Sequence, residues 1–141
     1  MEVRQARIGD IESLVSFDEV AHGDQLRREA LRQAIGRGQC LVCEEVGRVV
    51  GYGVLDYFFY DCGFIRLVYV HPDYRRRSVG STLVRAMEAQ CRTAKLFAST
   101  NRSNASMRAL LVKRGYVESG FIDNLDPGDP EVVYFKALPE R

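Results

Sequence analysis

The most informative stretch of the sequence is Val70-His71-Pro72-Asp73-Tyr74-Arg75-Arg76-Arg77-Ser78-Val79-Gly80-Ser81, which we call the cradle segment. It joins a predicted buried strand at residues 64–70 to a helix predicted over residues 77–91. The first backbone N–H groups of a helix have no partner inside it and lie at the positive end of its dipole. The start of this helix is therefore predicted to bind an anion.

The side chains of the cradle segment favour the same interpretation. Small residues at positions 78, 80 and 81 let an anion approach the backbone, and three consecutive arginines add attraction. A pyrophosphate suits such a turn, although a solvated basic turn is the simpler alternative. The segment is not a P-loop, because no Gly-Lys-Ser/Thr follows, and it lacks the Gly-x-Gly-x-x-Gly of dinucleotide-binding turns.

Hydrophobic periodicity predicts the elements around this segment. A helix opens at Asp10, which is a plausible cap, and further helices are expected at residues 24–35 and 104–114. The last of these is expected to bury Met107, Leu110 and Leu111. The other predicted strands cover residues 3–6, 40–45, 49–59, 95–99, 116–122 and 132–136. Strands clustered early and followed by βαβα predict one α+β domain over residues 1–141, a three-layer fold with helices on both faces of a mixed, mostly antiparallel sheet.

Composition and charge narrow the classes of function. Of 141 residues, 46% are hydrophobic and 28% charged, as in ordinary globular proteins. No membrane span or signal core is evident, so a cytoplasmic protein is expected. Six arginines against two acids lie in residues 66–92, whereas residues 116–131 hold five acids and no base. This separation suits an anionic ligand at one site and a cationic ligand at another, and argues against nucleic acid.

The four cysteines do not indicate a metal site. Cys40 and Cys43 have a spacing used for zinc, but in a strand residues three apart point to opposite faces. No second pair follows, so buried free thiols are the expected state and no metal cofactor is predicted.

The sequence resembles the GNAT superfamily of acyl-CoA-dependent N-acyltransferases. The family signature is Arg/Gln-x-x-Gly-x-Gly/Ala after a strand that ends in Val-x-Pro. It corresponds here to Val70-His71-Pro72 followed by Arg75-Arg76-Arg77-Ser78-Val79-Gly80. A second similarity is Asn104, which leads a helix that closes in Lys113-Arg114-Gly115-Tyr116. The element order agrees with the family over essentially the whole chain.

The resemblance implies acetyl-CoA as acyl donor and assigns residues to it. The backbone of Val68 and Val70 would pair with the pantetheine arm, and Asn104 would bond to the arm as well, unless its role is only to cap its helix. The pyrophosphate would be held by the amides of Arg75, Arg76, Arg77, Ser78, Val79, Gly80 and Ser81.

Three positions depart from the family pattern. Ser78 replaces the first signature glycine, and we expect ordinary first-turn dihedral angles there, with glycine chosen for clearance. Leu111 stands where many relatives carry a tyrosine that protonates the departing thiolate. Phe64 lies near the place of a carboxylate that some relatives use as base. The catalytic residues are therefore not identified. Either another group donates a proton to the thiolate, or the thiolate leaves without one. Catalysis would then rest mainly on holding amine and thioester together, with water taking the proton.

Two regions are candidates for the acceptor. Tyr57 and Phe59 share one face of a strand and could wall a pocket, or could be core. Asp126 and Asp129 lie in the last strand connection, where they could attract an ammonium group or form a plain solvated loop. The weaker candidates are Glu19, His22 and Asp24, between the first two helices.

The predicted function is transfer of an acetyl group from acetyl-CoA to a primary amine of a protein, peptide or small molecule by direct attack. The alternatives are a non-catalytic acyl-CoA-binding regulatory module and a generic phosphate- or nucleotide-binding domain. A homodimer is compatible with the resemblance.

Overall fold

The computed structural model describes residues 1–18 and 25–139. Their contacts divide the chain into two compact units, one of Met1–Leu55 and Leu67–Ala89, the other of Asp56–Arg66 and Gln90–Arg141. Seven strands are hydrogen-bonded in the order β1-β2-β3-β4-β5-β7-β6, a mixed sheet in which β4 and β5 are parallel. The predicted α+β fold class is confirmed.

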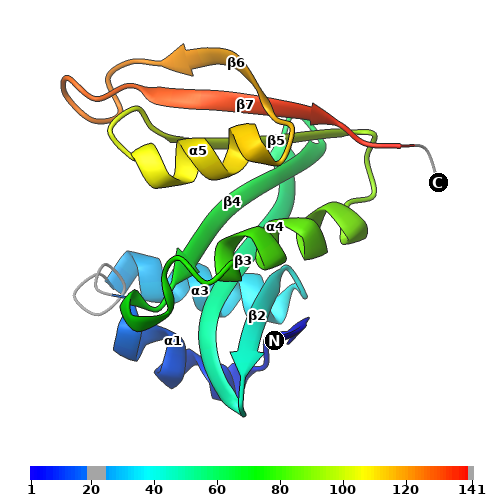
Figure 1. Ribbon diagram of the computed structural model, residues 1–141, viewed down its shortest axis with the longest axis vertical. Coiled ribbons are helices and arrows are strands. Elements are labelled where there is room, and N and C mark those ends of the chain that lie inside the picture. Colours follow the sequence, from blue (N-terminus) through cyan, green and yellow to red (C-terminus); the bar gives the residue numbers. More distant parts are fainter. Residues whose placement is uncertain (19–24, 140–141) are drawn as a thin grey trace. The chain divides into compact units, whose positions relative to one another are not determined.

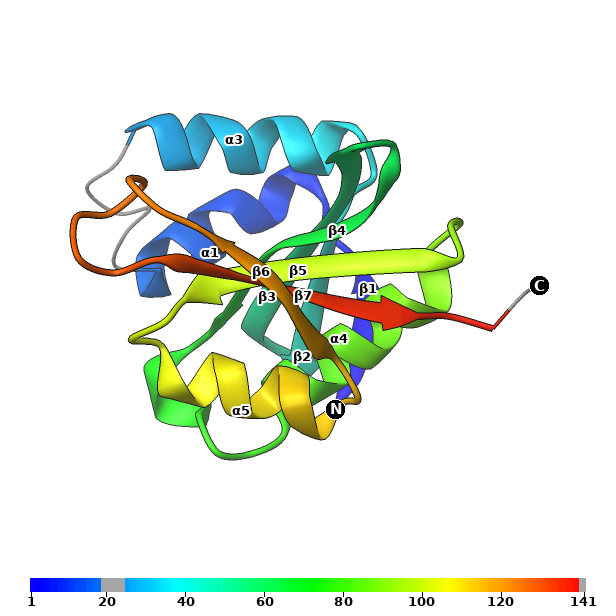
Figure 2. The same cartoon turned by 90° about the horizontal axis from the view of Figure 1, so that it is seen from above.

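The first unit contains the strands β1 (Glu2–Gln5) and β2 (Cys40–Glu45), most of β3 (Arg48–Phe59), and the end of β4 (Cys62–Val70). Its helices are α1 (Ile11–Phe17), α3 (Gln25–Gly36) and all but the last residue of α4 (Val79–Gln90). Antiparallel pairing joins β1 to β2 and β2 to β3. Figure 2 shows α1 and α3 on one side of these strands and α4 on the other.

Alternation along the strands explains this arrangement. Tyr52 and Val54 of β3 belong to a core cluster with Leu14 of α1 and Leu31 of α3. Gly51 and Gly53 face the opposite way, where a Cβ on Gly51 would lie 2.8 Å from Cγ1 of Val79. Glycine at these positions therefore lets α4 approach the backbone of the sheet.

The second unit contains the start of β4 with β5 (Lys95–Asn101), α5 (Ala105–Lys113), β6 (Val117–Ile122) and β7 (Glu131–Ala137). In Figure 1, α5 runs along one face of β5, β7 and β6. Its inward residue is Leu111, which is fully buried. Leu96 and Ala98, which are two residues apart on the same face of β5, are fully buried as well.

The predicted elements agree with the structure to within about two residues at most ends. Three details of the prediction are wrong. Asp10 does not cap α1 with its side chain, because its carboxylate accepts hydrogen bonds from the Arg7 amide and from Arg4. On α5, Met107 and Leu110 are only half-buried, so Leu111 alone of the three expected core residues is buried.

The cysteines are free thiols, and Cys40, Cys43 and Cys91 are buried. Cys40 lies in the core cluster that includes residues of α1 and α3. Cys43 is the cross-strand partner of Gly51, and a Cβ on Gly51 would point toward α4. The two thiols therefore lie on opposite faces. Within residues 1–18 and 25–139, no group of three or more His, Cys, Asp or Glu could hold a metal ion. None of the helices in this part of the chain combines the length and apolar character needed to span a bilayer.

Gly63 of β4 gives a direct test of packing in the second unit. A Cβ at this position would overlap the Sγ of Cys91 and lie 3.2 Å from Oγ1 of Thr93. We expect Gly63→Ala to lower the free energy of unfolding by about 1–3 kcal/mol, as overpacking usually does. In urea denaturation, adding Cys91→Ala should recover about 1 kcal/mol or more of that loss. Strictly additive losses would contradict the predicted steric cause.

Candidate functional site

The backbone of the cradle segment has an unusual conformation. Pro72–Tyr74 form a short 3-10 turn capped by His71, whose Nδ1 accepts from the Asp73 amide at 3.0 Å. Arg76 and Ser78 then take positive φ angles of 65° and 66° before α4 begins at Val79. The expectation of ordinary dihedral angles at Ser78 is wrong, because this residue precedes the helix. Glycine at this position would relieve the left-handed conformation as well as give clearance.

This conformation directs backbone donors toward one point. A left-handed residue followed directly by a helical one forms a nest, in which successive N–H groups converge on an anion. Ser78 and Val79 are such a pair. The Ser78 carbonyl accepts from the amide of Thr82 at 2.9 Å and from its Oγ1 at 2.7 Å, which fixes the first turn of α4. Amides arranged in this way at the start of a helix are able to bind an anion.

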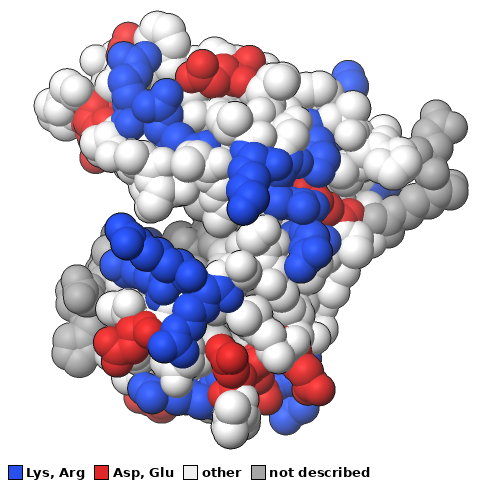
Figure 3. All heavy atoms as spheres, viewed as in Figure 1, with Lys and Arg blue, Asp and Glu red and all other residues white. Residues whose placement is uncertain are grey.

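The three arginines of the cradle segment are exposed. The guanidinium of Arg77 lies 5.2 Å from the ring centre of Tyr74, and that of Arg75 lies 5.7 Å from the ring centre of Tyr69. Figure 3 shows basic side chains gathered on the surface over the connection between β4 and α4. The aromatic rings restrict two long cations beside the start of α4 without neutralising them.

Substitution of Ser78 tests the strain at this site. A left-handed conformation costs a non-glycine residue roughly 1–2 kcal/mol, whereas glycine loses roughly 0.5–1 kcal/mol more chain entropy on folding. We expect Ser78→Gly to raise the free energy of unfolding by up to about 1 kcal/mol. Ser78→Val should lower it by at least about 1 kcal/mol. Urea unfolding of the three proteins should give the order Gly, Ser, Val. Equal stability of the glycine and valine variants would contradict the strain.

The remaining residues assigned to the pantetheine arm occupy defined places. Val68 and Val70 lie in the last part of β4, and the Val70 carbonyl accepts from Nε of Arg75 at 3.3 Å. In the second unit, Asn104 caps α5, because its Oδ1 accepts from the Met107 amide at 3.2 Å. The capping role is thus confirmed, and it uses the amide oxygen, so the side-chain NH₂ group is the part that can donate to a ligand.

Neither Leu111 nor Phe64 offers a proton-transfer group. Leu111, a residue of α5, is fully buried. Phe64 is also buried, stacks on Phe59 at 5.0 Å, and has the guanidinium of Arg66 4.5 Å from its ring centre. Both side chains contribute to packing in the second unit.

The two aromatic candidates of β3 have different surroundings. The Tyr57 hydroxyl accepts from the Arg92 amide at 3.1 Å, and the Arg92 guanidinium lies 4.2 Å from the Tyr57 ring centre. Phe59 belongs to an aromatic cluster with Phe64 and Phe97. The structure thus gives both rings packing contacts, and both are half-buried.

The acidic loop between β6 and β7 is held by its own carboxylates. Asp126 accepts from Nδ2 of Asn101 at 2.8 Å, and Asp129 accepts from the amide and hydroxyl of Ser103 at 3.0 and 2.6 Å. These contacts fix the loop to the start of α5, so the two aspartates have structural partners. The weaker candidates Glu19, His22 and Asp24 lie outside the described residues.

One polar pair of the second unit was not singled out from the sequence. Ser99 of β5 donates to Oε2 of Glu131 at the start of β7, with a distance of 2.8 Å, and both residues are half-exposed. The strand register places them on the face opposite α5. In the sequence, Glu131 stands out only as one of the five acids of residues 116–131. The alternation of side chains along two neighbouring strands would have indicated that Ser99 and Glu131 lie on the same face.

The sequence was compared with known proteins. A profile of the Acetyltransferase (GNAT) family matches residues 9–116. The comparison with curated protein sequences found no match. Among solved structures, the chain is similar to a GNAT-family acetyltransferase from Bacillus cereus, with 35% identity, a TM-score of 0.92, and coverage of 99% of this chain and 98% of that one.

Two more distant structures share the fold. A ribosomal-protein-alanine N-acetyltransferase from Brucella melitensis has 22% identity and a TM-score of 0.81, with coverage of 98% of this chain and 100% of that one. The protein yncA from Salmonella typhimurium, solved with its cofactor acetyl-CoA, has 20% identity and a TM-score of 0.79 over 100% and 95% of the chains. The family profile and the 35% identity together place this chain in the GNAT family of acetyltransferases.

Proposed function

We propose that the protein is an N-acetyltransferase that transfers the acetyl group of acetyl-CoA to a primary amine in a ternary complex. The observation that supports this most directly is the backbone nest at Ser78 and Val79 with its exposed arginines. Nests and helix N-termini bind phosphate groups. Because the chain belongs to a family of acetyltransferases, the pyrophosphate of CoA is the anion that we expect to bind at this nest.

The residues of the cradle segment would hold the donor by its phosphates. The amides from Arg75 to Ser81 would bind the pyrophosphate, and Arg75 and Arg77 would add charge-assisted contacts. Backbone groups of Val68 and Val70 would pair with the pantetheine arm, and the NH₂ group of Asn104 would donate to it. Acetyl-CoA itself supplies an activated thioester.

The chemistry needs little help from side chains. The amine nitrogen forms a bond to the acetyl carbon, the C–S bond breaks, and the amine proton passes to water. A thiol is a fairly good leaving group, with a pKa near ~8.5, so it can depart without an acid at position 111. The chain would accelerate the reaction by positioning the two reactants.

The acceptor is proposed as a class, a primary amine of a protein, peptide or small molecule. Tyr57 and Phe59 are proposed to border it, and the acidic loop with Asp126 and Asp129 would attract its ammonium form. No nucleic acid is involved in this proposal. The proposed cytoplasmic location and homodimer are tested by cell fractionation and by light scattering.

The test is to incubate the purified protein with acetyl-CoA and a panel of peptides, polyamines and aminoglycosides. We expect free thiol to appear in equal amount to an acetylated amine identified by mass spectrometry. Tight CoA binding without thiol release across the panel would instead support a regulatory acyl-CoA-binding module. Competition by adenine nucleotides as strong as that by CoA would support a nucleotide-binding domain.

A further inference from the structure

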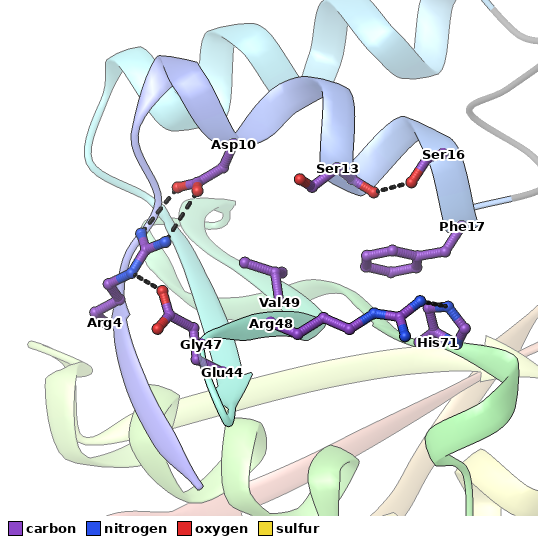
Figure 4. Close-up of a pocket in the computed structure, with 10 residues that line it drawn as sticks. All are labelled: Arg4, Asp10, Ser13, Ser16, Phe17, Glu44, Gly47, Arg48, Val49 and His71. Carbon is purple, nitrogen blue, oxygen red and sulfur yellow. Dashed lines mark hydrogen bonds and ion pairs between the residues drawn. The ribbon is translucent and has the colours of Figure 1, made fainter.

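The first unit contains a pocket of about 360 Å³ whose lining includes only His71 from the cradle segment. Figure 4 shows α1 along one wall and the connection between β2 and β3 along another. The residues that line it are Arg4, Asp10, Ser13, Ser16, Phe17, Glu44, Gly47, Arg48, Val49 and His71. The volume is within the range of small-molecule sites.

The polar contacts of His71 place a hydrogen-bond donor opposite each of its two ring nitrogens, although one of the nitrogens carries a proton. Nδ1 lies 3.0 Å from the backbone nitrogen of Asp73, and Nε2 lies 3.2 Å from Nη2 of Arg48. An amide N–H and a guanidinium can only donate, but a neutral imidazole must carry a proton on one nitrogen. Whichever nitrogen is protonated, a donor faces a donor. Because the amide contact caps the turn at Pro72–Tyr74, we assign the proton to Nε2, which faces Arg48.

Aromatic packing fixes the ring in this position. The centre of the His71 ring lies 5.2 Å from that of Phe17 and 5.4 Å from that of Tyr74, the latter edge-on. The Arg48 guanidinium lies 5.7 Å from the Tyr74 ring centre. The imidazole side chain is only 12% exposed. Two donors are thus held side by side at the pocket wall, and turning the ring over would lose the hydrogen bond from the Asp73 amide to Nδ1.

The carboxylates of the pocket are already paired at its other side. Arg4 donates from Nη1 and Nη2 to the two oxygens of Asp10, both at 2.9 Å, and from Nε to Glu44 at 2.5 Å. The hydrogen bonds from Arg4 hold the pKa of Asp10 below its usual range, although partial burial opposes them. Arg48 makes no ion pair with any residue in the described part of the chain, and its cross-strand neighbour Glu45 does not line the pocket.

We propose that this pocket binds a small anion, a carboxylate or a phosphate, whose oxygens accept from Nη2 of Arg48 and from the Nε2 proton of His71. An oxygen placed between these groups converts a contact between two donors into two hydrogen bonds. His71 directly precedes the turn that leads to Arg75, so the anion would also hold the start of the cradle segment. The proposal does not depend on acetyl transfer.

The test follows the imidazole nitrogens by NMR while inorganic phosphate or succinate is added at constant ionic strength. The chain has only two histidines, so a His22→Gln variant identifies the signals of His71. We expect the Nε2 signal of His71 to shift and saturate with at least one of the two probes. A response to succinate alone identifies a carboxylate site, and a response to phosphate alone identifies a phosphate site.

Substitutions locate the anion. Arg48→Gln should weaken the response at least tenfold, and it is tolerable because the glutamine oxygen can accept the Nε2 proton in the empty pocket. Arg32→Gln, an exposed arginine of α3 outside the pocket, is the matched control and should leave the response unchanged. The Arg75→Ala/Arg77→Ala protein should also retain it.

Two results would overturn the proposal. One is that the His71 signals do not move with either probe up to its solubility limit. The other is that the response persists in Arg48→Gln but disappears in Arg75→Ala/Arg77→Ala, since the anion then binds at the helix start of α4.

Discussion

Replacing Arg75 and Arg77 together by alanine is expected to weaken CoA binding at least a hundredfold, because each charge-assisted hydrogen bond to a phosphate contributes roughly 1.5–3 kcal/mol. Both arginines are exposed, and their contacts with Tyr69 and Tyr74 are cation–π contacts. Such contacts contribute about 0.5–1 kcal/mol each at the surface. The exposed hydrogen bond from Arg75 to the Val70 carbonyl adds about 0.5 kcal/mol, so the loss of unfolding free energy should be no larger than about 2.5 kcal/mol. Calorimetric titration with CoA and urea unfolding measure the two effects separately.

The matched control removes two arginines elsewhere in the first unit. Arg32 pairs with Glu29 at the surface of α3, and Arg85 is exposed on α4. The Arg32→Ala/Arg85→Ala protein has the same change in net charge, and its affinity for CoA should fall by no more than about threefold, the effect of screened long-range attraction. If both double variants lose affinity equally, general charge rather than the cradle segment determines binding.

Replacing Arg27 by alanine is expected to cause the largest loss of stability, about 3 kcal/mol, as when one partner of a buried ion pair is removed. Asp18, at the end of α1, is fully buried. Its Oδ2 accepts from Nη2 and Nε of Arg27 at 2.9 and 3.2 Å, and from the hydroxyl of Tyr52. These contacts join α1, α3 and β3, so their loss should lower the midpoint of urea unfolding markedly.

Two further variants provide reference values for this loss of stability. Arg32→Ala breaks an exposed pair of the same helix and should cost less than about 1 kcal/mol. Tyr52→Phe removes one hydrogen bond to Asp18 and should cost about 1–3 kcal/mol. A loss below 1 kcal/mol for Arg27→Ala, equal to that of the surface control, would contradict the buried pair.

Tyr52 also makes a contribution that depends on pH. Burial, together with the hydrogen bond to Asp18, raises the pKa of Tyr52 above its ordinary value of 10. The unfolded chain therefore releases the proton first, and stability is full below about pH 10 and is lost as the pH rises above it. In Tyr52→Phe this alkaline loss should be smaller than in the unchanged protein.

The fold could be predicted because its elements have clear periodicity and its turns have strong signals. Val46 and Gly47, which both have positive φ, connect β2 to β3, and a glycine between two strand-like runs indicates a hairpin. The left-handed residues Arg76 and Ser78 could not be expected, because neither residue type prefers that conformation and surrounding contacts impose it.

Local structure around the candidate site was predictable where backbone and spacing determine it, as in the connection from β4 to α4 and at the Asn104 cap. The partners of the candidate side chains were less predictable where they lie far away in the sequence. Asp126 and Asp129 are paired with Asn101 and Ser103, which are more than twenty residues away in the chain. The conflict at His71 likewise needs Arg48, which is twenty-three residues away. Sequence alone gives no measure of such distances.

The burial of the cysteines has a practical consequence for the experiments above. Burial raises the pKa of Cys40 to about 12 and also raises that of Cys43, so neither forms a thiolate readily at neutral pH. Cys91 is buried, whereas Cys62 is half-buried. A reagent that detects released CoA thiol will therefore also react with Cys62, and the blank needs one protein thiol per chain subtracted. The same thiol accepts a single maleimide dye without any substitution, which makes the native chain ready for fluorescence titrations.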